Sequence, residues 1–184
     1  LTSNNDNTQT EPEGLVDGNG MADGELAALV NFLWWADDGD NVLETGESVI
    51  NQGNFAQLGV GNSYPLTLAD SDQNIWTNTG GPVAGDTTLY IGKAWCFGTL
   101  GTAPVTQDGG DQGRSPAGNN GGTSALGEPE DGGITCNGTL LGNESQTDSL
   151  TADVTFEAVQ ARNNPGFQCA NPRPRTTLTL VKEV

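Results

Sequence analysis

Apolar residues in this chain gather in a few short runs separated by long polar stretches. Residues 29–36 form an apolar, aromatic run of the kind that packs a strand into a core, and residues 47–51 are typical of a short partner strand. Residues 87–97 carry the strongest strand signal, within which Gly92 indicates a bulge or a close backbone approach. The pattern predicts an all-β protein.

Two further stretches alternate apolar and polar residues. Residues 149–159 predict a half-buried antiparallel strand with one apolar face and one solvated face. Residues 175–184 alternate again, but Pro174 blocks pairing upstream, so this tail is predicted to be a detachable strand. Residues 22–28 contain helix formers and predict one or two helical turns, capped by Asp23. The apolar face of the 149–159 strand consists of Leu150, Ala152, Val154, Phe156 and Ala158.

The polar stretches suggest the domain organisation. Residues 1–24 have almost no apolar content and predict an exposed N-terminal arm or loop. Residues 25–170 form the main domain, and residues 171–184 form a C-terminal strand or linker. Inside the main domain, residues 98–133 are rich in Gly, Asn, Asp, Pro and Ser and predict one long loop.

Three cysteines allow one disulfide and one odd thiol. A bond between Cys96 and Cys136 would tie together the ends of the long loop and, on a chain-entropy estimate, contribute roughly 3–4 kcal/mol. We favour this pair, although the sequence leaves the other pairings open. Cys169 is then a free thiol or has a partner elsewhere.

The composition narrows the class of protein. Only 34% of the residues are hydrophobic and 27 are glycine, which fits a β-protein with a thin core and long polar loops better than a helical bundle. The net charge of −18 argues against nucleic-acid binding and against an anionic membrane surface. No segment approaches the apolar length of a membrane span, so we expect no membrane insertion. The charge suits a secreted or surface protein, or one partly neutralised by divalent cations.

An acidic loop follows the first apolar run and indicates a calcium site. Its carboxylates and one carbonyl approach the odd-position spacing of an EF-hand-type loop, except that Ala36 stands at the first ligand position, where Asp37 would have to substitute. The alternative is a solvated acidic turn at a hairpin tip, with Gly39 and Gly46 supplying the bends. The candidate calcium ligands are Asp37, Asp38, Asp40, Val42, Glu44 and Glu47.

Four segments, in this order, resemble the TasA/camelysin-like family of exported bacterial and archaeal surface proteins. They are residues 34–42, 90–98, 146–154 and 159–169, and the likeness covers roughly residues 25–170. The resemblance implies a jelly-roll-like antiparallel β-sandwich with long polar loops and at most one or two short helices. It also implies an extracellular or cell-surface protein, exported through a cleaved signal peptide, that self-assembles into fibres by lending a terminal strand to the next subunit.

The chain departs from this family at both ends. Leu1 lies after an extra strand region that family members carry near their cleavage site, and the tail looks like the opening of a following domain. A longer parent chain could then supply the partner of Cys169. If strand exchange operates, the tail is a candidate donor, and the alternative is an ordinary last strand or linker. The candidate assembly strand consists of Thr177, Leu178, Thr179, Leu180 and Val181.

The sequence favours a non-enzymatic function over an enzymatic one. Camelysin-type proteins have been described as metallopeptidases, but this chain contains no histidine to bind zinc or to act as a base. Asn137 and Asn143 begin glycosylation sequons. The four tryptophans are expected in the core, with a carbohydrate platform as the alternative.

The sequence therefore predicts a non-enzymatic, self-associating subunit of an extracellular filament or biofilm matrix fibre, with calcium at the acidic loop. The alternative is a non-polymerising adhesive or surface-display module of a longer secreted protein, calcium-stabilised and glycan-binding. A fibre subunit leaves a sheet edge open, whereas an adhesin closes its edges and presents an aromatic patch.

Overall fold

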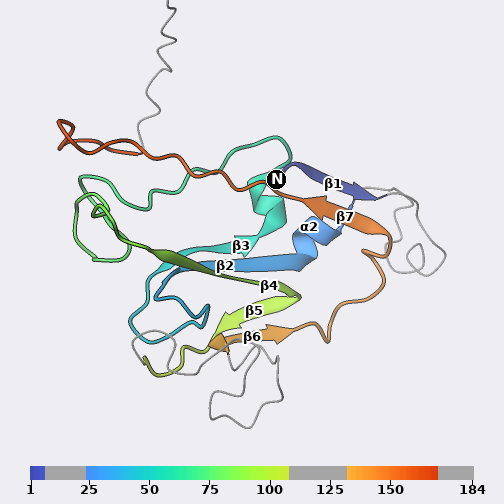
Figure 1. Cartoon of the computed structure of the whole chain (residues 1–184). Coiled ribbons are helices and arrows are strands. Elements are labelled where there is room, and N and C mark those ends of the chain that lie inside the picture. Colours follow the sequence, from blue (N-terminus) through green and yellow to red (C-terminus); the bar gives the residue numbers. More distant parts are fainter. Residues whose placement is uncertain (7–23, 108–131, 170–184) are drawn as a thin grey trace, which may run out of the picture.

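The computed structural model describes residues 1–6, 24–107 and 132–169 (Figure 1). Regular structure in these ranges is almost entirely antiparallel β-strand, as the sequence predicted, with one turn of α-helix and one of 3-10 helix. Within them, no helix has the length and apolar character of a membrane span. The elements are β1 (Ser3–Asp6), α2 (Leu26–Leu29), β2 (Val30–Asp37), β3 (Val49–Asn54), η1 (Phe55–Leu58), β4 (Tyr90–Phe97), β5 (Thr99–Thr102), β6 (Ile134–Asn137) and β7 (Asp148–Thr151).

The central sheet has the strand order β3-β2-β4 and contains the three strands that the sequence predicted most clearly. Both pairings are antiparallel with β2 in the middle, and most residues of β2 are buried. β2 and β3 form a hairpin with the acidic loop at its tip, as predicted. Gly92 of β4 is required by close packing, because a Cβ there would lie 2.0 Å from Trp35 Cε2.

One face of this sheet is covered by the β5–β6 pair. The core between them contains Leu33 and Trp35 of β2, Leu100 of β5 and Ile134 of β6, together with the disulfide between Cys96 and Cys136. The sequence predicted a loop over residues 98–133, and β5 corrects that prediction. Its four residues carry little strand signal, but pairing with β6, which the disulfide joins to β4, overrides local propensity.

The opposite face is covered at one end by α2 and the β1–β7 pair (Figure 1). The backbone N–H of Leu26 donates to Asp148 Oδ2 of β7 at 2.8 Å, so β7 caps the short helix, and the predicted cap Asp23 lies outside the described residues. β1 corrects the prediction of an unpaired N-terminal arm. Its polar residues form a strand because β7 offers a complementary backbone edge.

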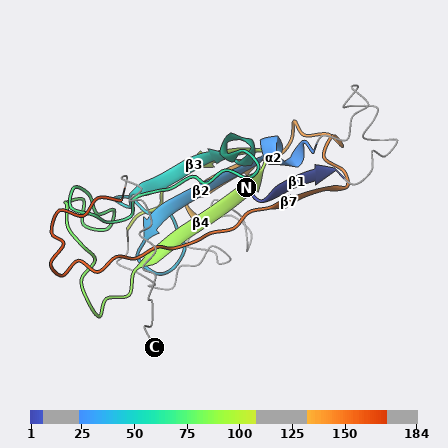
Figure 2. The ribbon, with the colours of Figure 1, turned by 90° about the horizontal axis from the view of Figure 1, so that it is seen from above.

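β7 is shorter than the strand predicted at residues 149–159. It ends at Thr151, and every residue from 152 to 159 is exposed, including Val154, Phe156 and Val159. Alternation supplied strand propensity, but no strand within the described residues pairs with this segment. The segment runs lengthwise along the molecule, roughly antiparallel to β4 (Figures 1 and 2).

Beyond this exposed segment, residues 167–169 are hydrogen-bonded to a second acidic loop. Asp70 Oδ2 accepts the backbone N–H of Cys169 at 3.1 Å, and Ser71 N donates to the carbonyl of Phe167 at 2.8 Å. Two further backbone N–H groups, of Asp72 and Gln73, donate to Asp70 Oδ1, and these bonds lower the pKa of Asp70. The stretch that follows β7 is therefore held at β7 and again at residues 167–169.

Candidate functional site

The acidic loop is organised around Asp37, the last residue of β2. The residue is buried, and its carboxylate accepts hydrogen bonds from Trp35 Nε1 at 3.1 Å and from the backbone N–H groups of Gly39 and Asn41 at 3.0 and 3.1 Å. Burial raises the pKa of Asp37, and these hydrogen bonds oppose that rise. Asp37 thus fixes the entry into the loop.

Glu47 closes the loop from the other side. Its Oε1 accepts the backbone N–H of Asp38 at 3.1 Å, and its Oε2 accepts that of Glu44 at 2.8 Å. Burial raises the pKa of Glu47 to about 7, and the charges of Asp37 and Asp38 act in the same direction. A carboxyl group in this position resists ionisation unless a positive charge arrives.

The fold brings the predicted carboxylate ligands into two overlapping groups. One group is Asp37, Asp38 and Asp40, the other is Asp38, Glu44 and Glu47, and the ligand atoms within each lie within 4.8 Å of one another. Oxygen ligands of one Ca²⁺ sit about 2.3–2.6 Å from the ion, so two of them can be separated by at most about 5 Å. The oxygens therefore fit calcium in spacing and in chemistry.

The middle of the loop is pinned to the body of the protein. Val42 and Leu43 are fully buried, and Val42 N donates to Asp40 Oδ1 at 2.8 Å. Leu43 N donates to the carbonyl of Gly132, and its own carbonyl accepts from Val105 N. Glu44, which is only 1% exposed, follows directly. The middle of the loop is thus packed into the body of the protein, whereas Gly39, Thr45 and Gly46 are exposed.

A second feature is an open groove of about 520 Å³ between the central sheet and β7. Trp95 and Phe97 of β4 form one wall and are 77% and 42% exposed. Exposed apolar surface of this kind marks sites of association. The open groove is lined by Leu26, Val30, Trp95, Phe97, Asp148, Ser149 and Leu150.

The backbone edge of β4 beside this groove is also open. β4 is an edge strand of the central sheet, and within the described ranges no backbone hydrogen bond joins its outer edge to another strand. Lys93 N instead donates to the side-chain Oδ1 of Asn41 at 2.9 Å. An open edge is a template for another strand.

The sequence predicted that all four tryptophans lie in the core, but the structure places only one of them there. Trp35 is buried, Trp34 and Trp76 are half-buried, and Trp95 is exposed. The reason is strand alternation: Trp95 pairs with Phe32 on the face of the sheet that β5–β6 does not cover. Sequence periodicity predicts that Trp95 lies on the other face of β4 from Ala94 and Cys96. Only the positions of the other strands decide which of these two faces is covered.

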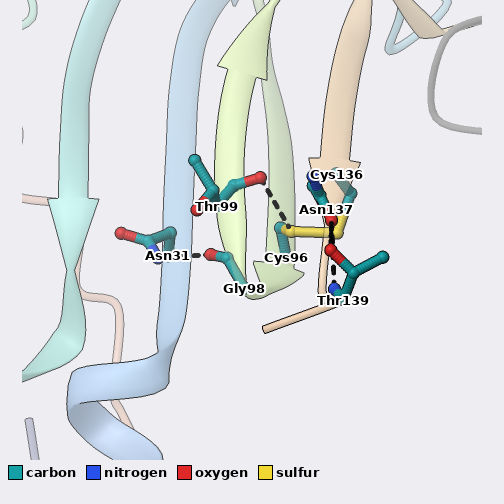
Figure 3. Close-up of a disulfide and its surroundings, with 7 residues drawn as sticks. All are labelled: Asn31, Cys96, Gly98, Thr99, Cys136, Asn137 and Thr139. Atoms are coloured by element: carbon teal, nitrogen blue, oxygen red, sulfur yellow. Dashed lines mark hydrogen bonds between the residues drawn. A yellow bond between two sulfur atoms is a disulfide. The ribbon is translucent and has the colours of Figure 1, made fainter. Parts of the chain in front are cut away.

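The disulfide joins the pair that the sequence favoured, Cys96 and Cys136 (Figure 3). Cys169 is exposed and unpaired with either of them, and partial burial of its thiol raises its pKa. The two sequon asparagines, Asn137 and Asn143, are both exposed. The candidate assembly strand, residues 177–181, lies outside the described residues.

No family model, curated protein or solved structure matches this chain.

Proposed function

We propose that this chain is a structural subunit of an extracellular filament or biofilm matrix fibre of the TasA/camelysin-like type, and that it assembles by strand exchange between copies. The observation that carries the proposal is the open groove beside the unpaired edge of β4, together with the exposed, alternating segment at residues 152–159. The role proposed is non-enzymatic, and its principal partner is a second copy of the chain.

An added strand would pair with the open backbone edge of β4 and would also cover exposed apolar side chains. The outer edge of β4 carries backbone groups suited to a strand ladder, and Trp95 and Phe97 expose apolar surface beside it. On the other side, Val154 and Phe156 present apolar side chains with no covering layer. A strand that pairs with β4 would extend the central sheet and cover part of this apolar surface, as a jelly-roll-like sandwich requires.

The C-terminal tail has the chemistry for this position. Residues 177–181 alternate threonine with leucine, so Leu178 and Leu180 would fall on one face of an inserted strand. Three of the six basic residues of the chain, Arg173, Arg175 and Lys182, lie within ten positions of one another around this stretch. A basic tail is attracted to the body of a second copy, because the chain as a whole carries a charge of −18.

Calcium is the proposed cofactor, held by the acidic loop. The support is the spacing within the two sets of acidic residues that share Asp38, together with the burial of Glu44 and the half-burial of Glu47 among like charges. A cation would relieve that repulsion and stiffen the β2–β3 hairpin. Its role is structural, since the loop is pinned to the core through Leu43.

Electron microscopy of the purified chain, with calcium and with a chelator, tests the proposal. We expect regular filaments, and we expect the Leu178→Ser/Leu180→Ser variant to lose them because its apolar face is gone. The matched control is Thr177→Ser/Thr179→Ser, which changes the polar face and should still assemble. Filaments formed by the leucine variant would exclude the tail as donor, and monodisperse particles under every condition would reject the fibre function.

The second candidate is an adhesive, glycan-binding module of a longer secreted protein. The observation that favours it is the 77% exposure of Trp95, because an exposed indole beside a groove can stack on a sugar ring. Binding of soluble oligosaccharides to a monomeric chain, lost in Trp95→Ala, would support this candidate. Filaments without glycan binding would support the first.

A further inference from the structure

The sequon at Asn137 is held in a defined conformation at the surface. Thr139 donates to Asn137 Oδ1 twice, from its backbone N–H at 3.0 Å and from its hydroxyl at 2.7 Å (Figure 3). These bonds form an Asx turn that closes on the amide oxygen. Asn137 is exposed, and no hydrogen bond from its Nδ2 is found within the described part of the chain.

The backbone around Asn137 supports this arrangement. Asn137 ends β6, where it pairs with Thr99, and it follows the disulfide residue Cys136. Gly98 has a φ of +126° and lies against this turn so closely that a Cβ would come 2.3 Å from the carbonyl oxygen of Asn137. The turn is therefore a fixed feature of the fold.

The second sequon differs. Asn143 is also exposed, but no side-chain hydrogen bond joins it to the hydroxyl of Ser145 among the described residues. Both sequons satisfy the sequence rule, and only that of Asn137 has the amide oxygen engaged by its own hydroxyl residue. The chain thus contains an internal control a few residues away.

A small hollow lies beside Asn137. It has a volume of about 190 Å³ and is lined in part by Leu29, Leu140 and Leu141. Leu140 is 95% exposed, which is unusual for a leucine in a fixed turn. The apolar face of a sugar ring attached at Asn137 would cover this leucine surface.

We propose that Asn137 is an N-glycosylation site and that Asn143 is not. The inference rests on the proposed export of the chain, because it requires an oligosaccharyltransferase and a glycan carried on a polyprenyl phosphate or diphosphate. Asn137 Nδ2 forms a bond to the anomeric carbon of the glycan and loses one proton. The bond between that carbon and the phosphate oxygen breaks, the polyprenyl phosphate or diphosphate leaves with the electron pair, and the amide proton passes to the solvent.

The test is mass spectrometry of the protein isolated from its source cells, in the cell-bound, extracellular and intracellular fractions. Fragmentation that preserves the glycan is needed, since the two asparagines lie close together in the sequence. We expect a glycan on Asn137 in most exported molecules, lost in Asn137→Gln and in Thr139→Ala but retained in Thr139→Ser and in Asn143→Gln.

Three results would overturn the inference. Exported protein with unmodified Asn137 would reject the site while leaving the fibre proposal intact. A glycan on Asn143 alone would reject the structural argument for choosing between the sequons. Unmodified protein confined to the cell interior would reject both the site and the proposed localisation. Filament formation by unmodified protein has no bearing on the site, so the two proposals fail separately.

Discussion

The two faces of the β3-β2-β4 sheet differ in how completely they are buried. On the face covered by β5–β6, Leu33 and Trp35 are 0% and 1% exposed and pack around a disulfide. On the other face, Phe32 packs against Phe55 of η1 with ring centroids 5.1 Å apart, whereas Trp95 next to it on β4 is exposed. One face therefore stabilises the chain, and the β4 side of the other remains exposed.

β4 shows how a single strand serves both purposes. Gly92, Ala94 and Cys96 point toward the covered face, where small side chains leave room for Trp35. Lys93, Trp95 and Phe97 point the other way and are exposed, and the two aromatic side chains line the open groove. Residue size along the strand thus follows what each face must pack against.

Truncating one tryptophan on each face should give the largest contrast. Trp35→Ala removes a fully buried indole and is expected to lower the free energy of unfolding by about 3–5 kcal/mol. Trp95→Ala removes an exposed indole and is expected to change it by less than about 0.5 kcal/mol in the monomer. Urea unfolding of the monomer measures both. Equal losses would show that the two faces are packed alike.

Removing the disulfide should destabilise the covered face almost as much. Cys96→Ser/Cys136→Ser opens a link between residues 40 apart, and the expected loss is roughly 3–4 kcal/mol. The unfolding midpoint with and without reductant should show the same shift in the parent chain. Cys169→Ser is the matched control and should leave the unfolding free energy nearly unchanged, because that thiol is exposed.

Adding a methyl group beneath Trp35 should lower the free energy of unfolding by a smaller amount. Gly92→Ala places a methyl group against the indole, so either the ring or β4 must move, at a cost of roughly 1–3 kcal/mol. Gly85→Ala is the control, because a Cβ there meets no neighbouring atom. Near-ultraviolet circular dichroism would report the indole environment directly. An unchanged spectrum and stability would mean that Trp35 does not lie over Gly92.

The acidic loop at the end of the covered face should give an effect that depends on pH. Folding raises the pKa of Glu47 from 4.5 to about 7, so between these values the folded chain holds more protons than the unfolded chain. Stability should therefore fall as pH rises through this window in the presence of a chelator. Glu47→Gln should flatten the slope, and calcium should offset the fall near pH 7.

A matched variant separates the loop from the general acidity of the chain. Asp86→Asn removes one exposed charge far from the loop in sequence and should leave the calcium effect intact. Isothermal titration calorimetry with calcium should show binding by the parent chain and by Asp86→Asn. Binding by Asp38→Asn should be weaker, since Asp38 belongs to both sets of acidic residues. No heat with the parent chain would reject the calcium proposal.

Local patterns were enough to predict β2, β3 and β4, the acidic loop at the hairpin tip, the close approach at Gly92 and the Cys96–Cys136 pair. Each depends on residues that are near in sequence, or on one long-range link of a simple kind. A run of large apolar residues can be buried only in a core, and a hairpin sets its own register.

Only the tertiary structure decided the rest. β1, β5 and β6 are four residues long and exist because a distant strand offers a backbone edge, which no local pattern encodes. Residues 152–159 show the reverse, since they have strand periodicity and lack a partner within the described residues. The exposure of Trp95 follows from the same cause. Alternation divides side chains between two faces, but which face is covered depends on elements that are remote in sequence.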